Sequence, residues 1–219
     1  MITLINVIEI NPLLYTKDDF ELPESSDYPD PEEWRFKWEE TASKLNFNFK
    51  IIGKGSSMAD IETMDDENLH MIIEARLEDM EDDPEEGIFT LAFDGGIALE
   101  KDSNIYIQPT CCGDMSDLKN WQDLLTNSSA EWKTLWIGHP WVLYRKENGK
   151  ISFSEYTESN EIDPENIKIL VEIDESELRA EFEKVLQRQT DFKNRVLNIL
   201  KKINAENPER MAELLTGMG

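Results

Sequence analysis

The sequence predicts an α+β protein with a mainly antiparallel sheet flanked by helices and a long C-terminal helix. Three observations carry this prediction. Apolar and β-branched residues alternate and cluster in short runs, beginning with residues 2 to 10. An Asn148-Gly149 pair separates two such runs, as in a β-hairpin. Apolar residues then recur with four-three spacing from residue 178 to residue 203, which is typical of a long amphipathic helix.

The composition predicts a folded and strongly acidic protein. The 219 residues are 39% hydrophobic, which is enough apolar material for a core without disulfides. The formal net charge is -25, from 47 acidic and 22 basic residues. This charge disfavours direct binding to nucleic acid, because phosphate recognition requires Lys and Arg, and it disfavours anionic membranes. A basic protein is the partner that the charge favours.

The sequence also predicts a cytoplasmic location. No stretch approaches the roughly 20 apolar residues that a membrane helix needs. Residues 1 to 10 lack the basic region and the cleavage site of a signal peptide. The two cysteines, Cys111 and Cys112, are adjacent, and neighbouring cysteines rarely have the geometry of an internal disulfide. This cysteine usage suits a reducing compartment.

The first third of the chain is expected to combine two strands with a helix. After the strand at residues 2 to 10, Pro31 opens a helix capped by Asp30. A second strand is expected at residues 47 to 51, where apolar residues alternate. The apolar face of the helix consists of Trp34, Trp38, Ala42 and Leu45.

Residues 60 to 86 are the most acidic stretch, and Arg76 is the one basic residue among them. Apolar residues recur at helical spacing within it, so we expect an amphipathic helix with an acidic outer face. Its apolar face consists of Leu69, Ile72, Ile73, Leu77 and Met80.

Short strands and tight turns are expected in the middle of the chain. Residues 88 to 93 are typical of a buried strand that ends at an Asp94-Gly95-Gly96 turn. Asp114 and Asp117 have capping-box spacing and precede a short helix with an apolar stripe. Further strands are expected at residues 97–100, 105–108, 132–136, 141–144, 151–156 and 167–173, and the last of them completes an antiparallel sheet.

The C-terminal part is expected to be helical. Asp174 and Glu177 have capping-box spacing at the start of a helix of nearly thirty residues. Gln189 interrupts the apolar stripe of this helix, which is also rich in Lys and Arg. A last short helix starts at Pro208 and stops at Gly217. We therefore divide the chain into an acidic α+β domain, residues 1–173, and a C-terminal helical extension, residues 174–219, packed on that domain or on a partner.

The acidic run at residues 78 to 86 is a candidate binding surface. Carboxylates could hold a hard cation, but the run lacks the ordered acid and glycine positions of an EF-hand loop. A solvated helix end is the alternative to a patch that steers a basic partner. The candidate partner-binding carboxylates are Glu78, Asp79, Glu81, Asp82, Asp83, Glu85 and Glu86.

The cysteine pair could carry chemistry, because Cys111 and Cys112 follow a strand and precede a helix, where backbone amides could activate a thiolate. Nucleophilic catalysis also requires a base, and the chain has only two histidines. A zinc site would need further ligands. Small residues packed at a strand end are therefore the favoured interpretation.

Trp136, His139 and Trp141 form the most suggestive turn of the chain. An aromatic-walled turn could hold an imidazole over a ligand, although a histidine between tryptophans is more often packed at the edge of a core. The two tryptophans could also anchor an interface. These three residues complete the candidate partner-binding set.

Part of the chain resembles bacterial toxin-immunity proteins of the SMI1/KNR4-like (SUKH) and related type. The similar residues are Phe93-Asp94-Gly95-Gly96-Ile97-Ala98-Leu99-Glu100 and Ile107-Gln108-Pro109-Thr110-Cys111-Cys112-Gly113-Asp114, with Trp121 and the turn from Trp136 to Trp141. The resemblance covers about a quarter of the chain and does not include the long helix. It implies a non-enzymatic α+β protein that binds and blocks a toxin, which is often a basic nuclease.

The sequence thus predicts a non-enzymatic, immunity-type protein that neutralises a basic protein partner such as a toxin, without a cofactor. Two alternatives stay open. One is a metal-dependent or thiol enzyme with a site near Cys111, Asp114 and His139, in which Asp94 or Asp114 holds a divalent ion. The other is an oligomeric module, such as a homodimer that pairs through the apolar stripe of the C-terminal helix.

Overall fold

The computed structural model describes residues 1–10, 30, 33, 49–53, 56–82, 92–159 and 163–219. The α+β class is confirmed, because antiparallel sheets, helices and the long C-terminal helix are all present. No helix in these ranges combines the length and apolar character required to cross a membrane. In chain order the elements are β1 (Ile2–Glu9), β2 (Met58–Asp60), α2 (Asp66–Asp82), β3 (Gly95–Lys101), β4 (Asn104–Ile107), the 3-10 helix η3 (Met115–Asp117), α3 (Leu118–Thr126), β5 (Lys133–Leu135), β6 (Val142–Glu147), β7 (Lys150–Ser154), β8 (Ile169–Asp174), α4 (Glu175–Lys202) and α5 (Pro208–Leu215).

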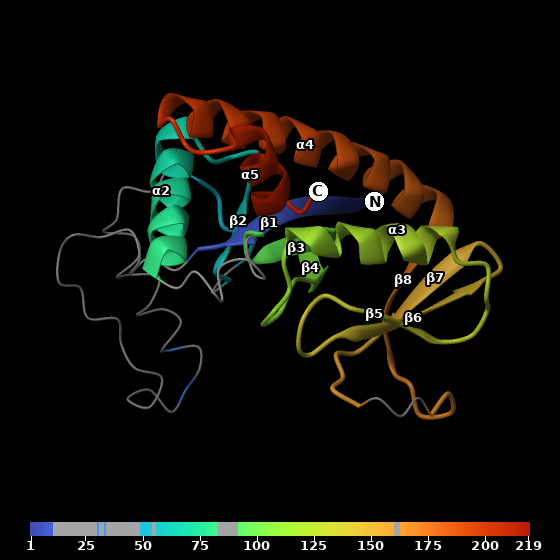
Figure 1. Ribbon diagram of the computed structural model, residues 1–219. Coiled ribbons are helices and arrows are strands. Elements are labelled where there is room, and N and C mark those ends of the chain that lie inside the picture. The colour runs from blue at the N-terminus through green and yellow to red at the C-terminus, as the bar shows by residue number, and fades with distance from the viewer. Residues whose placement is uncertain (11–29, 31–32, 34–48, 54–55, 83–91, 160–162) are drawn as a thin grey trace.

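The described strands form two antiparallel sheets, a division that the sequence did not predict. The first sheet has the order β2-β1-β3-β4 and the second has the order β5-β6-β7-β8. Helix α3 stands between β4 and β5 in the sequence, and the chain changes sheet across it (Figure 1). Alternating apolar residues show which face of a strand is buried, but they do not show which strand pairs with which.

Some of the expected elements lie outside the described residues. These are the helix opened by Pro31, with its apolar face, residues 47–48 of the strand expected at residues 47–51, and residues 88–91 of the strand expected before Asp94. Within the described part, Ile51 forms an isolated bridge with Ala59, at the edge of the first sheet.

The prediction of a turn at Asp94-Gly95-Gly96 is wrong. Gly95 and Gly96 are instead the first residues of β3 and pair with Ile8 and Val7 of β1. Their φ angles are 140° and 137°, which disfavour side chains. A Cβ on Gly95 would lie 2.2 Å from the carbonyl oxygen of Val7. The glycine pair therefore permits close approach of two strands rather than a reversal of the chain.

The hairpin expected at Asn148-Gly149 is confirmed. It joins β6 to β7, with Glu147 paired to Lys150 across the turn. Asn148 and Gly149 have φ angles of 51° and 75°, and positive φ at both central residues is the requirement of a type I′ turn.

One of the two expected capping boxes is present. Asp114 accepts a hydrogen bond from the backbone N–H of Ser116, and Asp117 reaches back to the N–H of Asp114. The prediction of a capping box at Asp174 is wrong, because the side chain of Asp174 makes no capping hydrogen bond. Its carboxylate instead accepts from Lys150 Nζ at 2.8 Å, across the β7–β8 pair. The ammonium group of Lys150, on the neighbouring strand, therefore binds the carboxylate that was expected to cap the helix.

Helix α4 and strand β1 each pass through two hydrophobic clusters. The first half of α4 and the start of β1 pack with α3 and the second sheet. The second half of α4 and the end of β1 pack with α2 and α5. Figure 1 shows α4 running above both regions. The α4 residues in the first cluster are Leu178, Phe182 and Val185, and those in the second are Phe192, Val196, Ile199 and Leu200.

The apolar stripe that could have paired two copies of the chain is therefore covered within one chain. A homodimer stays a prediction, but this stripe is not exposed for it. The same packing ties residues after 174 to the strands before it, and the division of the chain at residue 174 also stays a prediction.

Gln189, which interrupts the apolar stripe, lies between the two clusters and is 1% exposed. Its Oε1 accepts from Asn6 Nδ2 of β1 at 3.1 Å. Its Nε2 donates to the carbonyl oxygens of Met115 at 3.0 Å and Thr216 at 2.7 Å. This amide therefore joins α4 to β1, to η3 and to the residues that follow α5.

Replacing this amide tests the junction. We expect Gln189→Leu to lower the free energy of unfolding by about 3 kcal/mol, because it leaves buried polar groups of Asn6, Met115 and Thr216 without a partner. The matched control is Gln187→Leu, on the exposed face of the same helix, which should change stability by less than about 0.5 kcal/mol. Equilibrium urea unfolding gives both values, and equal losses in the two variants would contradict the junction's role.

Candidate functional site

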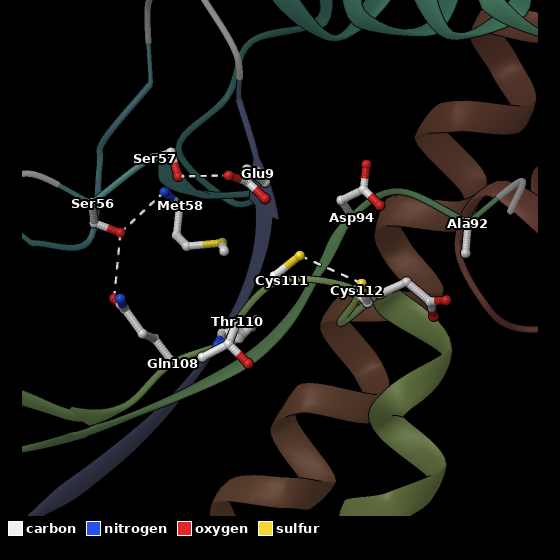
Figure 2. Close-up of a pocket in the computed structure, with 12 residues that line it drawn as sticks. Glu9, Ser56, Ser57, Met58, Ala92, Asp94, Gln108, Thr110, Cys111 and Cys112 are labelled. Atoms are coloured by element: carbon white, nitrogen blue, oxygen red, sulfur yellow. Dashed lines mark hydrogen bonds between the residues drawn. The ribbon is translucent and has the colours of Figure 1, made fainter. Parts of the chain in front are cut away.

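A pocket of roughly 640 Å³ opens where β4 leads into η3. One wall comes from residues 108 to 114, and the others come from the end of β1, the residues that lead into β2 and the residues that precede β3. Figure 2 shows Ser57 hydrogen-bonded to Glu9, and Ser56 to Gln108, on the side away from the cysteines. The lining residues are Glu9, Ser56, Ser57, Met58, Ala92, Asp94, Gln108, Pro109, Thr110, Cys111, Cys112 and Asp114.

The cysteine loop lies backbone to backbone against the aromatic turn. The N–H of His139 donates to the carbonyl oxygen of Cys111 at 2.7 Å, and the N–H of Thr110 donates to that of Ile137 at 2.9 Å. Gly138 has a φ of 105°, and a Cβ there would lie 2.5 Å from the carbonyl oxygens of both Thr110 and Cys111. Only glycine allows this contact, which brings Cys111 and His139 together.

Asp114 joins the same neighbourhood through a backbone bridge with Asp94. The three residues of the predicted enzyme alternative, Cys111, Asp114 and His139, are thus close in the fold. Their side chains form no metal centre, because no group of three His, Cys, Asp or Glu residues in the described part of the chain is placed to hold an ion. The Asp114 carboxylate is already used as a cap, and that of Asp94 lies 3.8 Å from Arg76.

Both cysteines are exposed and free, with 3.4 Å between their sulfurs. The hydrogen bond with Cys112 raises the pKa of the Cys111 thiol, and the carboxylates of Glu9 and Asp94 act in the same direction. Cys111 therefore favours the neutral thiol over the thiolate that nucleophilic catalysis requires.

The three residues of the aromatic turn, Trp136, His139 and Trp141, differ in their exposure to solvent. Trp136 and Trp141 stack with ring centroids 5.6 Å apart, and His139 meets them edge-on at 4.8 and 4.9 Å. Trp141 is buried, Trp136 is half-buried and His139 is exposed. Of the three predicted contact residues, His139 and Trp136 can therefore meet a partner directly, while Trp141 supports them from the core.

The predicted acidic surface is only partly described. Glu78 is exposed near the C-terminal end of α2. Asp79, Glu81 and Asp82 belong to the same helix, so the predicted amphipathic helix is confirmed over its described length. The remaining predicted carboxylates, Asp83, Glu85 and Glu86, lie outside the described residues.

The structure adds residues that sequence reasoning did not select. Glu67 and Glu74 are exposed on α2, and with Met71 and Glu78 they follow a four-three-four spacing along one helix face. Met71 is 40% exposed, which is unusual for a large apolar side chain in this fold. The signal was available in the sequence as the helical complement of the apolar face. We call Glu67, Met71, Glu74 and Glu78 the outer face of α2.

Nearby basic side chains are directed elsewhere. Arg76 of α2 donates to the carbonyl oxygen of Ala92 at 3.1 Å. From α4, Arg188 pairs with Glu62 at 2.9 Å and Arg195 pairs with Asp66 at 3.0 Å. On the outer face itself, Glu74 has His70 as a neighbour, with 3.2 Å from Nε2 to Oε1.

Asp117 and Asn120 are linked to the backbone of the aromatic turn by hydrogen bonds. Asn120 Nδ2 donates to Asp117 Oδ1 at 2.8 Å and to the carbonyl oxygen of Trp136 at 3.1 Å. Burial raises the pKa of Asp117 from an ordinary 3.8 to about 7, against the opposing effect of its hydrogen bond from Asp114. The capping-box spacing pointed to Asp117, but nothing in the sequence linked Asn120 to the turn.

Comparison of this chain with protein-family models, with curated protein sequences and with solved structures finds no match in any of the three. The functional proposal therefore depends on the chemistry of the residues described above.

The raised pKa of Asp117 predicts a pH dependence of stability. Between about pH 4 and 7 the unfolded chain is ionised at this residue while the folded chain keeps the proton. The folded state then binds more protons, so Asp117 makes stability fall as the pH rises through this window. We expect Asp117→Asn to remove that part of the fall in melting temperature.

The control for this titration is Asp123→Asn, an exposed carboxylate on α3. It should keep the wild-type pH profile between pH 4 and 7. Thermal unfolding followed by circular dichroism measures all three proteins. Parallel profiles for wild type and Asp117→Asn would refute a raised pKa at this residue.

Proposed function

We propose that this chain is a non-enzymatic, cytoplasmic binding protein of the immunity type that neutralises a basic protein partner such as a toxin. The observation that carries the proposal is the outer face of α2, where Glu67, Glu74 and Glu78 are exposed around Met71. The partner would dock a basic surface on this face and be occluded there.

The geometry of the outer face suits a row of basic side chains. Residues 67 to 78 span roughly 16 Å of helix at 1.5 Å per residue. Carboxylates at intervals of seven and four residues project from the same side, so they can meet several Lys or Arg residues at once. Met71 lies between them and offers a flexible apolar contact of the kind found at binding surfaces.

The charge distribution supports the same interpretation. Arg188 and Arg195 of α4 pair with Glu62, before α2, and with Asp66, the first residue of α2, rather than with the outer face. The net charge of -25 supplies a long-range field that speeds encounter with a cation-rich protein.

The aromatic turn offers a second contact region. Exposed His139 and half-buried Trp136 rest on buried Trp141, and this arrangement gives a rigid aromatic anchor with a polar tip. The resemblance to SUKH-type immunity proteins, which includes this turn, is the reason for proposing a toxin as the basic partner.

The outer face can be tested by charge removal at constant fold. A partner would first be captured with the tagged chain from cells that naturally produce it, and its association rate then measured. We expect the triple variant Glu67→Gln, Glu74→Gln, Glu78→Gln to slow association about tenfold at low salt, with little difference at high salt.

The matched control removes the same charge from exposed glutamates elsewhere, in Glu131→Gln, Glu158→Gln, Glu183→Gln. If steering depends only on net charge, both triple variants will slow equally and the outer face is not the docking surface. Association that ignores ionic strength would contradict the steering role altogether.

The aromatic anchor has its own test. We expect Trp136→Ala to weaken the affinity for the captured partner about tenfold, because half-buried aromatic anchors carry much of the binding energy of an interface. Trp132→Ala is the control, since Trp132 is also half-buried but lies against Arg145, 5.2 Å from its ring. Calorimetric titration measures both, and equal affinities for the two variants would remove the turn from the interface.

A further inference from the structure

The spacing of the Cys111 and Cys112 sulfurs carries an inference that is independent of the proposed partner. The two Sγ atoms are turned toward each other at 3.4 Å, as the dashed line in Figure 2 shows. Both side chains are exposed, and both line the pocket described above. Cys112 has a φ of 68°, an uncommon backbone conformation for a residue other than glycine.

A direct disulfide does not suit this pair. The Cα atoms of adjacent residues are about 3.8 Å apart, whereas disulfides usually join Cα atoms separated by about 4.4 to 6.8 Å. A single larger atom bonded to both sulfurs meets no such restriction, because it bridges them without bringing them into a covalent bond with each other.

The sulfur separation fits one particular bond angle at the bridging atom. With sulfur bonds of about 2.3 Å, a separation of 3.4 Å corresponds to an angle of roughly 95°. A tetrahedral ion with the same bonds would hold the sulfurs roughly 3.8 Å apart. Near-right angles are typical of trivalent, pyramidal metalloids such as arsenic(III), which bind thiols strongly.

The surroundings also favour a centre that brings its own third substituent. No group of three His, Cys, Asp or Glu residues among those described is placed to complete a metal site. The pocket beside the sulfurs has room for a substituent, with Met58, Ala92 and Pro109 as apolar lining. We propose that Cys111 and Cys112 form a chelating dithiol site for monosubstituted trivalent arsenicals and similar thiophilic metalloids.

The binding reaction balances without an oxidant or a reductant. An arsenical of the form R–As=O condenses with the two thiols, each As–O bond is replaced by an As–S bond, and both thiol protons leave with the oxygen as one water. Arsenic stays trivalent, and the sulfurs are neither oxidised nor reduced.

Phenylarsine oxide is a direct probe of this site, because the chain has two cysteines and thiol titration reports on this pair alone. We expect one equivalent to remove both free thiols of the reduced, folded protein, and intact-mass spectrometry to find one phenylarsenic group per chain. An excess of a dithiol should reverse the reaction. A product without arsenic that has lost two hydrogens would mean oxidation instead and would overturn the proposal.

The variants Cys111→Ser and Cys112→Ser separate chelation from attachment to one thiol. Each should weaken binding at least about a hundredfold, since the second sulfur no longer binds within the same molecule. Wild-type affinity in either variant would overturn the proposal, and circular dichroism establishes that both are folded.

Two further comparisons test the geometry. The folded chain should bind phenylarsine oxide about tenfold more tightly than the same chain in urea, because the fold holds the sulfurs at the required spacing. Zinc, measured by competition with a coloured chelator, should bind far more weakly than the arsenical. Equal affinity in urea, or zinc binding as tight as that of the arsenical, would refute a site built for a pyramidal centre.

Discussion

The hydrogen bonds of Gln189 are the interaction on which the arrangement of this protein depends. Helix α4 and strand β1 both run from one hydrophobic cluster into the other, and each carries a polar amide where the clusters meet. Asn6 and Gln189 bond to each other there, and Gln189 also binds the carbonyl oxygens of Met115 and Thr216. A buried amide that lacks a partner is costly, so all four segments must be in place together.

The contacts around Gln189 also fix the backbone segments that form the walls of the pocket. Met115 begins η3, directly after Asp114 and the two cysteines, and its N–H donates to the carbonyl oxygen of Phe93 just before β3. The residues after α5 pack against the same point, where a Cβ on Gly217 would lie 2.3 Å from the backbone nitrogen of Ser116. The loop that carries Cys111 and Cys112 is therefore anchored to the centre of the fold, although its thiols face solvent.

The charges of the protein divide into an internal and an external set. Arg188 of α4 pairs with Glu62 and donates to the carbonyl oxygen of Leu4 in β1. Arg195 binds the carbonyl oxygen of Ile61 and the carboxylate of Asp66, the first residue of α2. These contacts fix the approach to α2 and use cations that could otherwise have met the outer face. These basic residues of α4 thus neutralise acidic residues of the same chain only locally, and the carboxylates of Glu67, Glu74 and Glu78 remain exposed.

Local patterns in the sequence determined the elements, including the long helix, the acidic amphipathic helix, the Asn148-Gly149 hairpin and the Asp114 capping box. Each of these depends on residues a few positions apart, so the sequence alone carries the information. The tertiary structure decided what the patterns leave open: the division of the strands into two sheets, Gly95 and Gly96 inside a strand, and Gln189 as a junction instead of a break. It also decided which carboxylates stay exposed and how far apart the two sulfurs lie. Periodicity shows that a face is buried, but the partner that buries it comes from a distant part of the chain.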